Sequence, residues 1–222
     1  MIKTLFKKYS TYSRRQRSRI FHSYFKIGPE TTILDLGGGD GNLIASMVKN
    51  KKNVCIADFD KQALQKAAKM GFNVIELDES GKIPIVKNQF DIIFSNSVLE
   101  HVTVDKKDVY QFKTNKEFYK AAIERQKLFA EEVRCKSDRY YVQTPYKYFM
   151  IESHSWLPVI IVFLSRRLQF AILNFTNKFW VKRTSPDWNL LTYREMQDLF
   201  PDAKIIKEKS FFMVKSLIAI KA

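Results

Sequence analysis

The sequence has little cysteine, and neither of its two cysteines lies where a metal site or a disulfide framework would need it. Cys55 lies inside an apolar run, and Cys135 lies near the end of an amphipathic stretch. A small secreted domain held together by disulfides is therefore excluded. This cysteine usage fits a reducing compartment best, so we expect a cytoplasmic protein.

The sequence also lacks an apolar run of the roughly 20 residues that a membrane-spanning helix needs. Its longest such run, residues 156–164, is followed by Ser165 and then by Arg166 and Arg167. A secretory signal is missing as well. The first residues are basic and contain serine, as in a transit peptide, but the first predicted core strand follows almost at once. We therefore expect no cleaved leader.

Acidic residues are scarce in two segments that carry most of the net charge of +15. Residues 1–29 contain eight basic residues and no acid, and residues 146–183 contain six basic residues against Glu152 alone. Basic patches of this kind attract the phosphates of nucleic acid, of anionic lipid or of a phosphorylated substrate. The basic character therefore belongs to two appendages of an almost neutral core.

Four of the seven glycines gather in residues 37–41, directly after the apolar run of residues 32–36. This pattern predicts a buried strand, a tight turn and the start of a helix, in which glycine lets a ligand approach backbone amides closely. The dinucleotide fingerprint G-x-G-x-x-G is not met, because Asn42 takes the place of its third glycine. The pattern that remains is D-x-G-x-G-x-G, from Asp35 to Gly41.

Three further apolar runs end in a polar residue, at Asp58, Asp78 and Asn96. An acid at the carboxyl end of the second strand can accept hydrogen bonds from both hydroxyls of a ribose. Together with the glycine motif, this order resembles the class I S-adenosylmethionine (SAM)-dependent methyltransferases of the type 11/12 group. The segment Ser97–His101 is similar to the one that follows the fourth strand in that family. The resemblance covers about residues 30–145 and 190–222.

The resemblance implies SAM as the cofactor and assigns roles to the residues that match. Asp35 would lie near the amino group of SAM, Asp58 would bind the ribose, Phe59 would lie on the adenine face, and Asn96 would border the methyl group. The adenine amino group would be bound by an acid after the third strand, and the glycines would approach the methionine half. These residues are Asp78 or Glu79, and Gly37, Gly39 and Gly41.

A metal-using subset of the family has a glutamate three residues before a Glu-His pair. Here Ser97 holds that place before Glu100 and His101, so we expect no metal site. His101 is then either a residue hydrogen-bonded to the backbone or a base at the pocket wall.

Residues 146–190 form an insertion between the fifth strand and the last helix. Its segment Ile151–Pro158 resembles one found in methyltransferases of cell-surface sugar and lipid-linked precursor pathways. The resemblance makes His154 a second candidate base, oriented by Glu152, and the alternative is a histidine that satisfies loop carbonyls. The apolar runs around Arg166 predict either an interfacial helix pair on an anionic membrane or a lid over an apolar pocket.

The predicted fold is a doubly wound α/β sheet of seven Rossmann-like strands with a helical cap. We expect a basic N-terminal helical segment at residues 1–29, a SAM-binding core at 30–145, the cap at 146–190 and the end of the core sheet at 191–222. Helices are predicted at residues 10–25, after the glycine loop, at 61–70, at 116–135 and after a capping box that opens at Thr192.

The predicted function is methyl transfer from SAM to an oxygen of a small, sugar or lipid-linked acceptor, with His154 or His101 as the base. An RNA methyltransferase would explain the net charge, although no separate RNA-binding module is visible. A non-catalytic SAM-binding protein is the second alternative. We expect a cytoplasmic location, and association with a membrane stays open. Nucleic acid is the less favoured partner.

Overall fold

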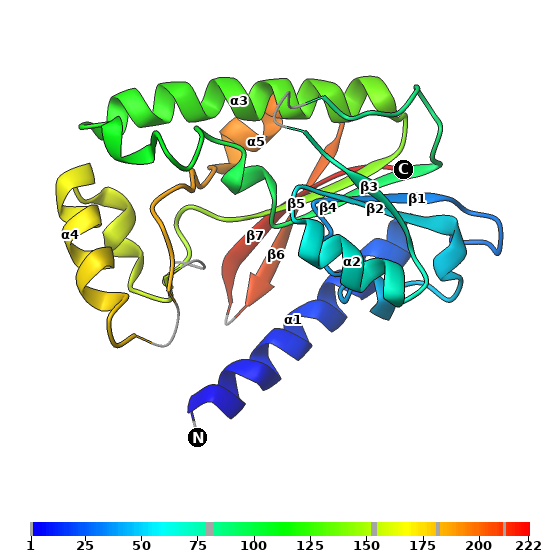
Figure 1. The fold of residues 1–222 in the computed structure, drawn as a ribbon, viewed down its shortest axis with the longest axis horizontal. Coiled ribbons are helices and arrows are strands. Elements are labelled where there is room, and N and C mark those ends of the chain that lie inside the picture. The colour runs from blue at the N-terminus through cyan, green and yellow to red at the C-terminus, as the bar shows by residue number, and fades with distance from the viewer. Residues whose placement is uncertain (1, 79–81, 152–154, 181–182, 211) are drawn as a thin grey trace. The chain divides into compact units, whose positions relative to one another are not determined.

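A seven-stranded sheet of order β3-β2-β1-β4-β5-β7-β6 organises the structure (Figure 1). The computed structural model describes residues 2–78, 82–151, 155–180, 183–210 and 212–222, with side chains from residue 11 onward. Strands β1 to β4 pair in parallel in the order β3-β2-β1-β4, so their carboxyl ends meet at one edge. The strands are β1 Ile33–Leu36, β2 Val54–Asp58, β3 Asn73–Glu76, β4 Ile92–Asn96, β5 Tyr140–Pro145, β6 Lys204–Ser210 and β7 Met213–Lys221.

Five α-helices accompany these strands in the described residues. They are α1 Ile2–Tyr24, α2 Lys61–Lys69, α3 Asn115–Lys136, α4 Arg166–Thr176 and α5 Tyr193–Leu199. The predicted doubly wound α/β fold with a sheet of seven strands is confirmed.

The chain packs as two compact units. The first comprises Met1–Asn96, Cys135–Val142 and Ile220–Ala222, and the second comprises Ser97–Arg134 and Gln143–Ala219. The glycine motif and the first four strands therefore belong to the first unit, and the cap belongs to the second.

Aromatic packing attaches α1 to the sheet of the first unit. Phe21 is fully buried, and its ring centroid lies 5.4 Å from that of Phe94 and 5.7 Å from that of Tyr141. Phe94 and Tyr141 stack on each other at 4.9 Å. Phe25 is buried beside them. The helix predicted at residues 10–25 is confirmed, and it begins earlier, at Ile2.

The α-helix predicted after the glycine loop is wrong. Residues Ile44–Ser46 and Lys51–Asn53 form two short 3₁₀ turns instead. Polar side chains hold the amides of this stretch in turns, because Asp40 accepts from the amide of Asn42 and Asn50 accepts from the amide of Lys52. The glycine loop is therefore followed by short turns rather than by the N-terminus of an α-helix.

The helix predicted at residues 61–70 and the capping box predicted at Thr192 are confirmed. The Asp60 side chain accepts from two amides of the first turn of α2, at 2.9 and 3.1 Å, and Gly71 follows its end with a φ of +92°. Thr192 and Glu195 form a capping box at the start of α5.

The predicted inner face of α3 needs one correction. The sequence pattern places Phe118, Ala122, Leu128 and Val133 on one face, and three of them are buried, but Leu128 is 61% exposed. The buried stripe runs through Gln126, which lies two positions and thus about half a turn from Leu128.

Candidate functional site

The carboxylate of Asp58 is held at the carboxyl end of β2 by two backbone amides. Its Oδ2 accepts from the amide of Gly39 at 2.8 Å, and its Oδ1 accepts from the amide of Asp60 at 2.9 Å. A carboxylate oxygen accepts two hydrogen bonds, so each oxygen keeps room for a further donor. The two hydroxyls of a vicinal diol match this arrangement.

The glycine loop beside Asp58 needs its glycines for two different reasons. Gly37, Gly39 and Gly41 have φ values of +74°, +56° and +73°, which lie in the left-handed region. Gly38 was not singled out from the sequence, but a Cβ on it would collide with the carboxylate of Asp35. The left-handed backbone of Gly37, Gly39 and Gly41 shapes the loop, and the missing side chain of Gly38 leaves space for the carboxylate of Asp35.

Asp35 lies at the end of β1 and is only 3% exposed. Burial, and then repulsion from Asp58, raise the pKa of its carboxyl group from 3.8 to about 8. A buried carboxyl group of this kind gains most from a cation placed beside it. The ammonium group of an amino acid ligand would supply that cation, so the loop, Asp35 and Asp58 together fit the cofactor that the sequence predicts.

The raised pKa of Asp35 predicts that the free energy of unfolding falls as the pH rises. Between pH 4 and 8 the folded chain keeps a proton on Asp35 that the unfolded chain loses, so this contribution is present below about pH 4 and lost toward pH 8. The slope is at most about 1.4 kcal/mol per pH unit. Asp35→Asn should remove it, and chemical unfolding of both proteins at several pH values would measure it. Equal slopes in the two proteins would contradict the prediction.

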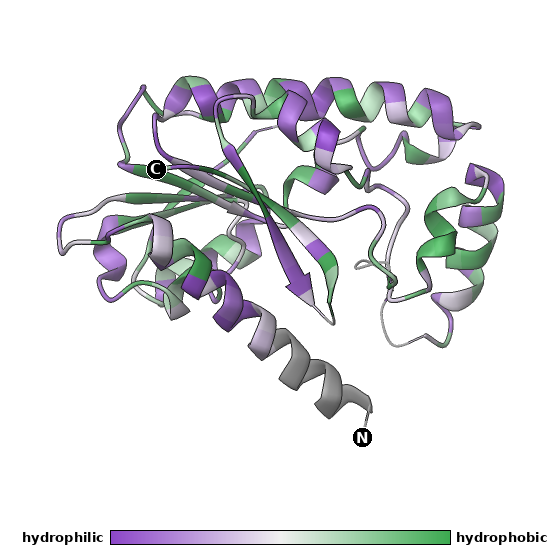
Figure 2. Cartoon of the chain, turned by 180° about the vertical axis from the view of Figure 1, so that it is seen from behind, coloured by the Kyte–Doolittle hydropathy of each residue, from purple (hydrophilic) through white to green (hydrophobic). Residues whose placement is uncertain are grey.

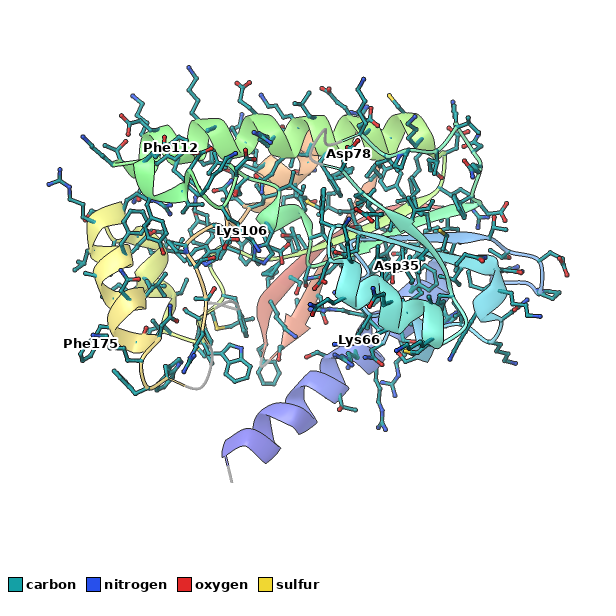
Figure 3. The ribbon with its side chains drawn as sticks, viewed as in Figure 1. Asp35, Lys66, Asp78, Lys106, Phe112 and Phe175 are labelled. Carbon is teal, nitrogen blue, oxygen red and sulfur yellow. The ribbon has the colours of Figure 1, made fainter. Side chains whose placement is uncertain are left out.

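The other predicted cofactor residues lie at the same strand ends. Phe59 follows Asp58 and is 58% exposed. Asp78 is exposed two residues after β3, as labelled in Figure 3. Glu76 forms an ion pair with Lys61 at 2.9 Å and is thereby engaged. Glu79 lies outside the described residues.

Asn96 ends β4, and its side chain is contacted by α1. Arg17 Nη1 donates to Asn96 Oδ1 at 3.2 Å. No local pattern marks this pair, because the two residues are far apart in the chain and arginine is common on the exposed face of a basic helix. The N-terminal helix therefore reaches the strand end where the methyl group is expected.

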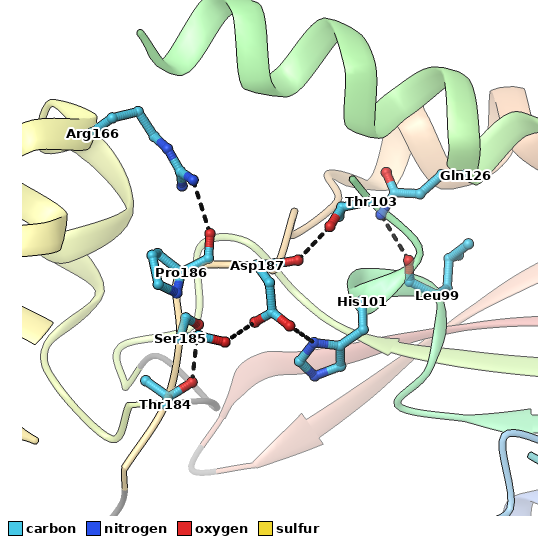
Figure 4. A network of polar contacts seen from close by, with 9 residues as sticks. All are labelled: Leu99, His101, Thr103, Gln126, Arg166, Thr184, Ser185, Pro186 and Asp187. Atoms are coloured by element: carbon cyan, nitrogen blue, oxygen red, sulfur yellow. Dashed lines mark hydrogen bonds and ion pairs between the residues drawn. The ribbon is translucent and has the colours of Figure 1, made fainter. Parts of the chain in front are cut away.

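In the second unit, His101 pairs with Asp187 (Figure 4). His101 Nδ1 lies 3.7 Å from Asp187 Oδ2, and the imidazole is partly exposed while Asp187 is almost buried. Burial pushes the pKa of Asp187 up, but hydrogen bonds from His101 and Ser185 outweigh it and hold the pKa below its ordinary value. Asp187 therefore stays ionised and orients the imidazole. His154 lies outside the described residues.

The loop that carries Asp187 is fixed on both sides. Thr103 Oγ1 donates to the carbonyl oxygen of Asp187 at 2.6 Å, and Arg166 Nη2 donates to that of Pro186 at 3.0 Å (Figure 4). Further along, the amide of Asn189 donates to the carbonyl oxygen of Glu100 at 2.8 Å. These contacts hold Asp187 in place opposite His101.

Asp187 and Arg166 were missed from the sequence. Asp187 is the only acid between Glu152 and Glu195, and this isolation is the one signal that could have marked it. Arg166 was predicted to lie beside either an interfacial helix pair or a lid, and it is 3% exposed, so it does not offer its charge to a membrane surface.

The Glu100 carboxylate is not accessible to a metal ion. It is fully buried, and its Oε2 accepts from Thr144 Oγ1 at 3.0 Å. Within the described part of the chain, no group of three or more histidines, cysteines and acids is placed to hold a metal ion.

Residues 34–115 match the family model of a methyltransferase domain. A search of curated proteins finds no match. Among solved structures, a SAM-dependent methyltransferase from Aquifex aeolicus is similar at a TM-score of 0.50 and 18% identity, over 99% of this chain and 98% of that one. The YcgJ protein from Bacillus subtilis is similar at a TM-score of 0.52 and 14% identity, over 88% and 70%.

The small RNA methyltransferase HEN1 is also similar, at a TM-score of 0.53 and 17% identity. The match covers 93% of this chain and 24% of that one. At these identities the structural likeness concerns the fold.

Proposed function

We propose that this chain is a class I SAM-dependent methyltransferase and that it methylates an oxygen atom of its acceptor. The observation that carries the proposal is the pairing of His101 with Asp187. A hydroxyl acceptor loses its proton as it is methylated, so a positioned base accelerates the reaction. His101 is proposed as that base, with Nε2 as the atom that takes the proton and Asp187 as the positioning residue.

The cofactor is SAM, whose sulfonium supplies an activated methyl group. The protein therefore has to bind SAM and the acceptor, orient them relative to each other and exclude water. We propose that Asp58 holds the ribose hydroxyls, Asp35 the amino group and Asp78 the adenine amino group. Phe59 would lie on the adenine face, and Asn96 would border the methyl group.

Methyl-labelled SAM incubated with the protein and a fractionated cell extract tests the acceptor class. We expect label in a small-molecule, sugar or lipid fraction, as an ester or ether that does not form without the protein. Label on nitrogen or carbon would contradict the oxygen acceptor. Label in the RNA fraction would favour the alternative of an RNA methyltransferase.

That alternative has one supporting observation, the basic outer face of α1. Arg14, Arg15 and Arg19 are exposed there, and the helix contains no acid. Binding to bulk RNA that weakens steeply with salt would favour it.

We propose further that the acceptor is amphiphilic and is reached at an anionic membrane surface. Figure 2 shows hydrophobic residues along much of α4, and Figure 3 labels Phe175 on this helix. Five large apolar residues of this region are 46% exposed or more: Ile160, Phe163, Leu168, Phe175 and Phe179. Arg167, Lys178 and Arg183 are exposed among them, and residues 153–186 contain no acid. The described helices include none of the length and apolarity needed to cross a bilayer.

Co-sedimentation with vesicles checks this surface. The intact protein should bind vesicles that contain anionic lipid, and binding should fall with salt, because each suitably placed basic residue adds about 1 kcal/mol. Replacing Ile160 and Phe163 by Asp should release it. Leu128→Asp on α3 is the matched control, since Leu128 is 61% exposed. If the intact protein stays in the supernatant with anionic vesicles at low salt, the proposal of a membrane-binding surface is wrong.

A further inference from the structure

A pocket of about 380 Å³ lies within the second unit, between the start of α3, the residues after β5 and the cap. Its lining combines basic side chains with aromatic side chains. Lys116, Lys147 and Arg166 supply positive charge, and none of the lining residues is acidic. The aromatic residues in the lining are Phe118, Tyr119, Tyr148, Phe163 and Trp188.

Arg166 is the most deeply buried cation in this lining, at 3% exposed. Its guanidinium carbon lies 3.9 Å from the ring centroid of Phe118 and 4.8 Å from that of Phe170. Both terminal nitrogens donate hydrogen bonds, to Gln169 Oε1 and to the carbonyl oxygen of Pro186 among others. The buried Nε has no hydrogen-bond partner within the described residues.

A buried guanidinium with an unused donor is costly unless something compensates it. Asp187 is the acid that influences Arg166, but its carboxylate is already engaged by His101 and Ser185. Burial lowers the pKa of Arg166 to about 10, so it still carries its charge at neutral pH. An anion in the pocket would supply a negative charge beside this guanidinium group.

Lys147 adds a second charge at the pocket wall. It follows β5, is partly buried, and its Nζ lies 5.8 Å from the ring centroid of Tyr119. The nearby acid Glu195 is occupied, because it accepts from Tyr119 Oη at 2.7 Å and from the amide of Thr192 at 2.6 Å. Lys147 therefore remains able to serve a ligand.

We propose that this pocket binds a molecule with an anionic group, a carboxylate or a phosphate, attached to a planar or apolar body. Arg166 and Lys147 would bind the anion, and the rings would cover the body. The identification of this molecule as the methyl acceptor rests on the proposed function. It is supported by Asn189, which lines the pocket and also bonds to the carbonyl oxygen of Glu100 next to His101.

Two fluorescent probes that differ by one anionic group test the pocket without any turnover. Anilinonaphthalene sulfonate carries a sulfonate on the ring system of phenylnaphthylamine, which is neutral. The intact protein should bind the sulfonate about tenfold more tightly than the neutral probe, as expected for a charge-assisted hydrogen bond. Equal affinity for the two probes would overturn the proposal.

Lys147→Met keeps the aliphatic stem and removes the charge, so it should abolish most of this preference without changing the affinity for the neutral probe. Arg166→Lys keeps a positive charge but lacks the forked donors of a guanidinium group, so it should reduce the preference for the sulfonate probe as well. Lys127→Met, on the exposed side of α3 and outside the pocket lining, is the control and should change nothing. An unchanged preference in Lys147→Met would reject the site, whatever happens to Arg166.

Competition between phenyl phosphate and benzoate for the bound probe then distinguishes a phosphate from a carboxylate. Displacement by one of them identifies the anion, and displacement by neither contradicts the proposal. Because these measurements need no acceptor and no SAM, a negative result here leaves methylation of oxygen intact. A failure to detect any methylated oxygen would conversely leave the pocket intact.

Discussion

Asp58→Ala is expected to weaken the binding of SAM and of its demethylated product by roughly 30- to 1000-fold. The range corresponds to about 2 to 4 kcal/mol for two charge-assisted hydrogen bonds. In this structure the carboxylate is already held by the amides of Gly39 and Asp60, so little ordering remains to be done when a diol binds. Titration calorimetry with both ligands measures the loss.

Asp60→Ala is the matched control, two residues away. Asp60 caps α2 through the amides of Gln62 and Ala63, so its loss should lower the free energy of unfolding by about 1 kcal/mol. The affinity of the folded protein for SAM should stay the same. An Asp58→Ala protein that binds SAM with unchanged affinity would end the assignment of Asp58 to the ribose.

The parallel strands and their polar ends were predictable because each depends on local sequence. An apolar run that stops at an acid marks a strand end in the sequence itself, as Asp58 after β2 illustrates. Asp60 and the capping box at Thr192 are equally local, since their hydrogen bonds reach amides two or three residues away.

The failures concern features that depend on tertiary contacts. Nothing near Arg166 in the sequence shows that Phe118 and the carbonyl oxygen of Pro186 will surround it. An arginine beside an apolar run is compatible with a membrane interface and equally with a buried cation. Similarly, Asp187 is paired with a histidine 86 positions earlier in the chain, and no periodicity links the two. The missing helix after the glycine loop has a different cause, since short polar side chains outcompete helix formation there.

His101→Ala is expected to lower turnover on the true acceptor by about a hundredfold or more, while the affinity for SAM stays intact. A general base contributes in the transition state, so the change should appear in kcat rather than in cofactor binding. His22→Ala is the control, because His22 is an exposed histidine on α1. His154→Ala is made in parallel, since this residue remains the other candidate.

Asp187→Asn separates a catalytic histidine from a structural one. Replacing the carboxylate by an amide removes the ionised partner that orients the imidazole, so kcat on the true acceptor should fall while the affinity for SAM stays the same. A purely structural role would lower the free energy of unfolding without lowering kcat of the folded protein. Thr103→Val, which removes the hydrogen bond to the backbone of Asp187, tests the loop alone and should change the rate less than Asp187→Asn does. If the histidine variants both retain near-normal rates, then positioning of the acceptor accounts for catalysis, and the pair of His101 with Asp187 serves to hold the loop.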